Sequence, residues 1–113
     1  GAPPMNIFPL EDAEAVHAVE PAPGRDALRV LCGVRPEDIQ LDAAMKPGFL
    51  PAKIRLAEPT GPQTILTLET GKLNFRAAWT RSYDEIKRSD SVYFRLPPER
   101  LHYFDSTTCC RIP

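Results

Sequence analysis

Two charged turns at opposite ends of the sequence are the strongest candidates for chemistry. Residues 33–38 read GVRPED and residues 96–105 read LPPERLHYFD, so each sets a Pro-Glu pair beside an apolar segment. Glu37 and Glu99 could in principle pair as a general acid and a general base. Because each of them follows a proline, where side-chain oxygens accept hydrogen bonds from the next backbone amides, we favour turn capping for both.

Two arginines flank these turns. Arg35 and Arg100 each flank a turn whose neighbouring segments are apolar. A guanidinium in that position can fix its turn by bidentate pairing with a carboxylate, such as Glu99 or Glu37. The alternative is contact with a partner domain or with an anion, and we favour the structural role because it needs only local geometry.

The histidines and cysteines give weaker signals. His17 and His102 have no cysteine or histidine at metal-ligand spacing, so we interpret them as surface or packed side chains and expect no metal site. The cysteines are odd in number, and the adjacent Cys109 and Cys110 are too close for a routine structural bridge. A reducing cytosol is the simpler context, and a redox role for the adjacent pair remains an alternative.

Aromatic side chains offer one further possibility. Trp79, Phe75, Tyr93, Phe94 and Tyr103 could form a stacking platform for a sugar or a base. Aromatics at alternating strand positions more often belong to the core. Because neighbouring residues of a strand point to opposite faces, at most one of Tyr93 and Phe94 can be a core residue.

Composition excludes several classes of function. The 113 residues include 14 basic and 15 acidic side chains, and the net charge of -1 argues against a nucleic-acid partner. The sequence contains no Gly-x-x-x-x-Gly-Lys-Ser/Thr loop, so we expect it neither to bind ATP nor to have catalytic residues or a bound cofactor of its own. No segment approaches the roughly 20 consecutive apolar residues of a membrane span, and we expect no membrane insertion.

Short strands must position these residues, because 13 prolines and 6 glycines are dispersed along the chain. Alternating apolar residues and turn signals predict an all-β barrel or sandwich, with one helical turn at 83–88 and a connecting turn at 21–26. The predicted strands are 7–10, 15–19, 27–34, 39–41, 49–57, 64–69, 73–79, 91–96 and 101–104. In the second of these, Val16 and Val19 alternate with polar neighbours, and in the fifth, Ala52, Ile54 and Leu56 are expected on one face.

The two turns, together with the opening residues, resemble a known module. Residues 33–38 and 96–105 look like the signature turns of the TOBE module, a small barrel appended to the ATPase subunits of ABC importers. Residues 1–8, GAPPMNIF, resemble the segment where the ATPase domain of maltose-type importers meets that barrel. The resemblance implies an OB-fold-like barrel (TOBE domain) of short antiparallel strands covering residues 1–113, cut from a longer protein.

The resemblance also implies a function and partners. It implies the C-terminal regulatory and dimerisation domain of the ATP-binding subunit of an importer for carbohydrates or related solutes. ATP and Mg²⁺ would bind only to the absent ATPase domain. The implied partners are a second copy of the subunit, permease subunits reached through the ATPase domain, and a cytosolic regulator. The implied location is the cytoplasmic face of the inner membrane.

A third segment carries part of the resemblance. Residues 58–64 correspond to the family's Glu-x-x-Gly-x-Glu-Thr turn, matching at Glu58, Gly61 and Thr64 and departing at Gln63. The spacing between residues 6 and 33 is shorter than the maltose-type pattern, which predicts that a strand pair of the barrel is missing. The signature-turn and interface candidates are Arg35, Pro36, Glu37, Gly61, Tyr93, Phe94, Pro98, Glu99 and Arg100.

The interface is expected at the last long strand. Residues 92–96 place bulky side chains on both faces, and a small barrel can bury only one face, so we expect an exposed apolar edge that contacts a second copy. Two other classes of function stay open. One is a separate OB-type domain that binds a small sugar or anion, and the other is a nucleic-acid-binding OB domain, which the net charge disfavours.

Overall fold

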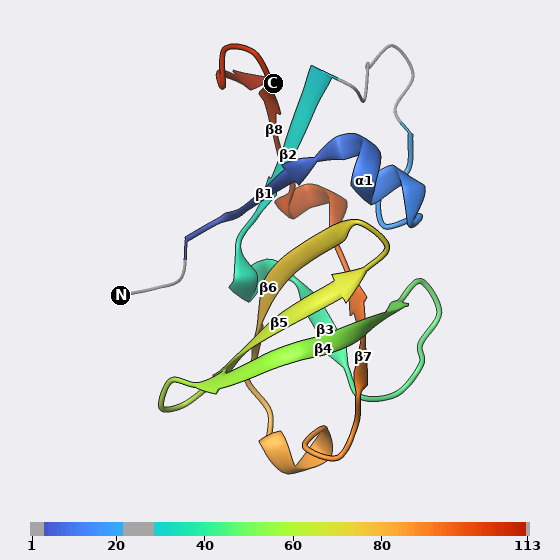
Figure 1. Ribbon diagram of the computed structural model, residues 1–113, viewed down its shortest axis with the longest axis vertical. Coiled ribbons are helices and arrows are strands. Elements are labelled where there is room, and N and C mark those ends of the chain that lie inside the picture. Colours follow the sequence, from blue (N-terminus) through green and yellow to red (C-terminus); the bar gives the residue numbers. More distant parts are fainter. Residues whose placement is uncertain (1–3, 22–28, 113) are drawn as a thin grey trace.

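Antiparallel strands make up most of the structure, a computed structural model that describes residues 4–21 and 29–112. The smaller sheet contains β1 (Asn6–Pro9), β2 (Val30–Val34), β8 (His102–Asp105) and β9 (Arg111–Ile112) in the order β1-β2-β8-β9. Figure 1 shows this sheet at one end of the long axis and the larger sheet beyond it.

The larger sheet has five strands and curls into a half-barrel. It contains β3 (Gln40–Asp42), β4 (Leu50–Pro59), β5 (Thr64–Thr70), β6 (Leu73–Trp79) and β7 (Ser91–Arg95), in the order β3-β7-β4-β5-β6. Every pairing is antiparallel. Together the two sheets confirm the predicted all-β, OB-like fold.

The core follows the period-2 patterns of the strands. Alternate residues of β5 and β6, such as Leu66, Leu68 and Phe75, are less than 4% exposed. The central strand β2 is buried or half-buried along its length, as its apolar run predicts. Gly33 in β2 has a particular packing role, because a Cβ there would lie 2.7 Å from Met5 Sδ and 2.9 Å from the Phe104 ring.

The prediction of a strand at 15–19 is wrong. The chain instead forms a short helix, α1 (Leu10–Ala15), followed by turns. Leu10 and Ala13 lie three residues apart on the buried side of this helix, and two acidic residues in its first turn complement the helix dipole. His17 adopts φ 64°, which helps end the segment, so the Val16 and Val19 alternation did not indicate a strand. The predicted turn at 21–26 falls largely outside the described residues.

The long strand β4 contains an irregularity that the sequence did not reveal. Its register against β5 shifts between Ile54 and Leu56, which marks a β-bulge. The sequence pattern placed Leu56 on the same face as Ala52 and Ile54, but the extra residue turns it outward and leaves it 51% exposed. Ala57 packs against the core instead.

The predicted helical turn at 83–88 is confirmed as a 3-10 turn, η3 (Tyr83–Glu85).

Candidate regulatory and interface site

The two signature turns (residues 33–38 and 96–105) are the crossovers between the sheets. The first contains the 3-10 turn η2 (Pro36–Asp38), which carries the chain from β2 in the smaller sheet to β3 in the larger one. The second contains η4 (Pro98–Arg100), which returns the chain from β7 to β8. The repeated Pro-Glu pattern therefore corresponds to a repeated structure, a 3-10 turn at each crossover between the sheets.

The crossovers are held next to each other by strand pairing. Gly33 pairs with His102 on the smaller sheet, and Gln40 pairs with Arg95 on the larger one. These pairs stand immediately on either side of both turns. Arg95 Nη1 also donates a hydrogen bond of 3.1 Å to the side chain of Gln40, so the two connections form one junction between the sheets.

The backbone closes both turns. Asp38 N donates to Arg35 O and Arg100 N donates to Pro97 O, each at 3.0 Å. In the described part of the chain, no ion pair or side-chain hydrogen bond involves Arg35, Arg100, Glu37 or Glu99. The predicted arginine pairing and glutamate capping are therefore wrong, because proline geometry and two backbone hydrogen bonds suffice.

The turn residues differ in exposure. Pro36 is fully buried beneath the first turn, where η2 packs against β6. Arg35 and Glu37 are exposed, as are Pro98, Glu99 and Arg100 in the second turn. The charged candidates thus lie on the surface of the junction, where another molecule can reach them.

A groove of about 460 Å³ adjoins the second signature turn. Its walls bring together Arg95 and Tyr103 from the ends of two strands with His17 and Glu20 from the segment after α1. Leu96 and Leu101 contribute apolar surface. Residue spacing could not reveal this site, since its polar groups come from segments about 80 residues apart in the sequence.

Residues 92–96 do not form the exposed apolar edge that the sequence suggested. Strand β7 lies inside the sheet, between β3 and β4, and Val92, Phe94 and Leu96 are buried. Phe94 packs on Phe75 with ring centroids 4.8 Å apart. Tyr93 points the other way and is half-buried, so the prediction that only one of the adjacent aromatics is core is confirmed.

The other aromatics do not form a stacking platform. Trp79 is 1% exposed and Phe75 is 3% exposed, so both are core residues. Tyr103 is half-buried, packs against the core and also lines the groove. The core interpretation therefore holds for the buried rings, and none of the five side chains is exposed in the described structure as a stacking platform for a sugar or a base needs.

Gly61 has a backbone role in the β4–β5 turn. Its φ is 95°, a conformation that glycine adopts without strain, and nothing lies within 4 Å of a Cβ built there. Thr60 closes the turn, because its backbone N and its hydroxyl both donate to Gln63 O, at 2.9 and 3.1 Å. The match at this glycine is therefore a requirement of turn geometry.

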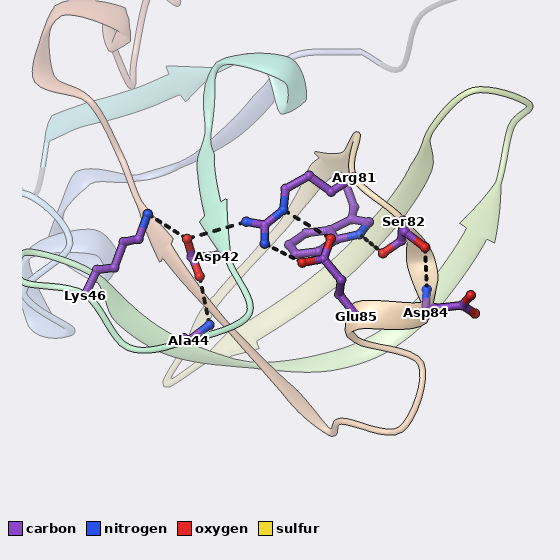
Figure 2. Close-up of polar contacts among 8 residues, drawn as sticks. Asp42, Ala44, Lys46, Arg81, Ser82, Asp84 and Glu85 are labelled. Carbon is purple, nitrogen blue, oxygen red and sulfur yellow. Dashed lines mark hydrogen bonds and ion pairs between the residues drawn. The ribbon is translucent and has the colours of Figure 1, made fainter.

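A buried carboxylate links two loops at the far end of the larger sheet. Figure 2 shows Asp42 between Lys46 and Arg81. The carboxylate accepts a hydrogen bond from Ala44 N at 2.9 Å, and its Oδ2 lies 2.7 Å from Lys46 Nζ and 3.5 Å from Arg81 Nη1. Arg81 in turn pairs with Glu85.

Trp79 contacts the same cluster through Arg81 and the neighbouring Ser82. The Arg81 guanidinium lies 5.2 Å from the centre of the Trp79 ring, and Trp79 Nε1 donates to Ser82 O at 3.0 Å. The cluster fixes the loops that follow β3 and β6 against the core. Sequence reasoning missed it, because Asp42 and Arg81 carry no shared motif.

Acid should loosen this end of the domain. The Lys46 ammonium, the Ala44 amide and the Arg81 charge lower the pKa of Asp42 from 3.8 to about 2. A lowered folded-state pKa means that the ionised carboxylate contributes stability above pH 4, and this contribution is lost as the pH falls toward 2. Asp42→Asn should therefore lose less stability than the native chain between pH 4 and pH 2, as thermal unfolding across that range would measure.

A second variant separates this effect from general acid unfolding. Lys46→Met removes the strongest cause of the lowered pKa, so its acid sensitivity should shift in the same direction as that of Asp42→Asn. Identical pH profiles for the native chain and both variants would show that the Asp42 cluster does not contribute.

The comparisons with known proteins agree with this architecture. The sequence profile described as the TOBE domain matches residues 32–104. These limits fall at Cys32 in β2 and Phe104 in β8, two strands that pair with each other, and the span includes both crossovers. The chain belongs to the TOBE domain family.

Two curated relatives of this TOBE domain are much longer proteins. The xylose/arabinose import ATP-binding protein XacJ of Haloferax volcanii is 33% identical over 86 residues, which cover 67% of this chain and 22% of XacJ. The osmoprotective compounds uptake ATP-binding protein GgtA of Synechocystis sp. is 29% identical over 103 residues, covering 88% of this chain and 26% of GgtA. The chain thus spans about a quarter of the length of these relatives.

Asn6 lies outside the matched span and joins the two sheets of the TOBE domain. From β1, its Nδ2 donates to Val34 O at 3.1 Å and to Arg76 O at 2.8 Å, while its Oδ1 accepts from Arg76 N at 2.7 Å. Because β6 is an edge strand, the carboxamide makes the pair of bonds that a neighbouring strand would make. The asparagine in the opening segment thus has a clear structural role.

Metal and membrane signals do not add to the site. Within residues 4–21 and 29–112, no cluster of three or more His, Cys, Asp or Glu side chains is placed to hold a metal ion. No helix in that same part of the TOBE domain is both long and apolar enough to cross a membrane.

Proposed function

We propose that this chain is the regulatory and dimerisation domain of the ATP-binding subunit of an ABC importer for carbohydrates or related solutes. The observation that carries the proposal is the family match through both crossovers, combined with two relatives that are described as import or uptake ATP-binding proteins. One relative is named for xylose and arabinose and the other for osmoprotective compounds, which favours small polar solutes.

The proposed partners follow from that role. ATP and Mg²⁺ bind to the ATPase domain of the parent subunit, and permease subunits contact that domain. A second copy of the subunit contacts this one through the surface of the junction, where Arg35, Glu37, Glu99 and Arg100 are exposed. Attachment to a dimerising ATPase raises the local concentration of the two barrels, so a small contact suffices. The parent protein then lies in the cytoplasm at the inner membrane.

A second candidate function is supported by the groove beside the second signature turn. Arg95, His17 and Tyr103 line a volume within the range of small-molecule sites, next to apolar surface from Leu96 and Leu101. Such a lining suits a small polar ligand, either an effector of the importer or the ligand of a separate binding domain. Dimerisation of the subunit requires the attached ATPase domain. Binding of a small ligand in the groove, in contrast, would be measurable with the isolated chain.

The test of dimerisation uses the parent subunit with its permease. Arg100→Glu should weaken ATP-driven dimerisation by about tenfold or more, equivalent to about 1.4 kcal/mol, because it reverses an exposed charge at the junction. Sedimentation would measure the dimerisation, and solute-stimulated ATP hydrolysis would report assembly with the permease.

Arg88→Glu is the matched control, because Arg88 is equally an exposed arginine but lies in the loop before β7, away from the crossovers. Equal behaviour of the two variants would remove the junction as the contact. Removal of the whole domain without any effect on dimerisation, ATP hydrolysis or transport would overturn the proposed function itself.

A further inference from the structure

The hairpin between β8 and β9 carries two adjacent thiols that the proposed function does not use. Cys109 and Cys110 are free and exposed, whereas Cys32 is buried in β2. Figure 1 shows this hairpin at the end of the molecule opposite η3. The thiols are therefore accessible to reagents and far from the Asp42 cluster.

Hydrogen bonds fix the backbone on both sides of the pair. Cys109 N donates to Asp105 O at 2.7 Å, and Asp105 N donates to Cys110 O at 2.8 Å. The Asp105 carboxylate also accepts from the backbone N of Thr107 and of Thr108, at 2.8 and 3.0 Å. The two cysteines thus belong to a closed hairpin loop with a defined conformation.

The conformation of Cys109 is unusual for its residue type. Its φ is 59°, in the left-handed region where this kind of hairpin loop normally has glycine. The side chain is exposed, so core packing gives no reason to keep a cysteine there. Backbone strain at an exposed position, where packing does not require the residue, points to a functional use of its side chain.

Geometry favours bridging of the thiols by a third atom over a direct bond between them. Neighbouring Cα atoms are about 3.8 Å apart, whereas disulfides usually span about 4.4–6.8 Å between Cα atoms. A direct bond between Cys109 and Cys110 is therefore strained and easily reduced. Insertion of one larger atom relieves that constraint, and thiolates prefer soft, polarisable partners.

We propose that Cys109 and Cys110 form a dithiol site that captures one trivalent arsenic atom. With an arsenoxide of the type R–As=O, two S–H bonds break and two As–S bonds form, and the oxygen leaves with both protons as water. Arsenic stays trivalent, so no oxidant or reductant is required. The product is a nine-membered ring that contains the As atom, the two Sγ atoms and the six side-chain and backbone atoms that join them through the peptide bond between Cys109 and Cys110.

Phenylarsine oxide is the probe for this site. The reduced 113-residue chain should bind one equivalent, seen as a single adduct in intact-mass spectra, and should lose two of its titratable thiols. Cys109→Ser and Cys110→Ser should each weaken retention of the probe at least roughly a hundredfold, because one sulfur cannot chelate. Cys32→Ala is the matched control and should retain the full adduct.

A glycine variant separates folding from capture. Cys109→Gly should fold at least as well as the native chain, since glycine adopts the positive φ freely, yet it should lose the adduct. Adducts of equal stability on the single-serine variants would overturn the proposal, because they would indicate binding by separate thiols. Complete conversion of the pair to an internal disulfide by an equimolar mixture of oxidised and reduced glutathione would also overturn it.

Discussion

Phe94→Ala is expected to destabilise the domain by about 3–5 kcal/mol, the usual cost of truncating a fully buried phenylalanine. The ring is 0% exposed and packs on Phe75 across the larger sheet. Its strand, β7, pairs with β3 on one side and with β4 on the other. Collapse of the sheet into the cavity would therefore require both pairs of strands to shift. Urea unfolding of the isolated domain would measure the loss.

Tyr93→Ala is the matched control at the next position of the strand. Because Tyr93 points to the outer face and is only half-buried, its truncation should cost less than about 1 kcal/mol. Losses of similar size at both positions would contradict the placement of Phe94 in the core. If the expected difference is found, Tyr93 becomes the residue at which contacts with a second subunit can be tested without loss of folding.

The strands were predictable because their patterns are local. Leu68 and Phe75 each stand between two polar residues, and the period of two predicts which face is buried. The Pro-Glu turns were predictable for the same reason, since proline restricts its own φ and that of the residue before it. What the sequence did not show is that both turns cross between sheets, because that depends on pairing between strands about 70 residues apart.

The errors arose where tertiary packing overrides a local pattern. The Val16 and Val19 alternation suggested a strand, but Leu10 and Ala13 bury better from a helix. Leu56 followed the alternation of β4 until a bulge turned it outward. The groove and the Asp42 cluster could not be predicted, because each joins segments that are far apart in the sequence. The groove joins residues 17–20 to residues 95–103, and the cluster joins residues 42–46 to residues 81–85.

Asn6→Ala is expected to destabilise the domain by about 2–3 kcal/mol, because it removes three hydrogen bonds that each contribute about 1 kcal/mol net. The loss should exceed that of an ordinary surface asparagine, since the carboxamide joins β1 to the edge of β6. Asn74→Ala is the matched control. Asn74 is exposed on the same β6 strand and donates only to the nearby Lys72 O at 3.3 Å, so its truncation should stay within about 0.5 kcal/mol.

Asn6→Asp tests which of the three bonds matters most. An ionised aspartate still accepts from Arg76 N, but it places negative charge beside the carbonyl oxygens of Val34 and Arg76, where the native side chain donates. At neutral pH this variant should therefore be at least as unstable as Asn6→Ala. Below about pH 4 the protonated carboxyl regains a donor, so the deficit relative to the native domain should shrink. A deficit that is independent of pH would mean that the donated bonds contribute little, and that the bond from Arg76 N alone holds the two sheets together at this edge.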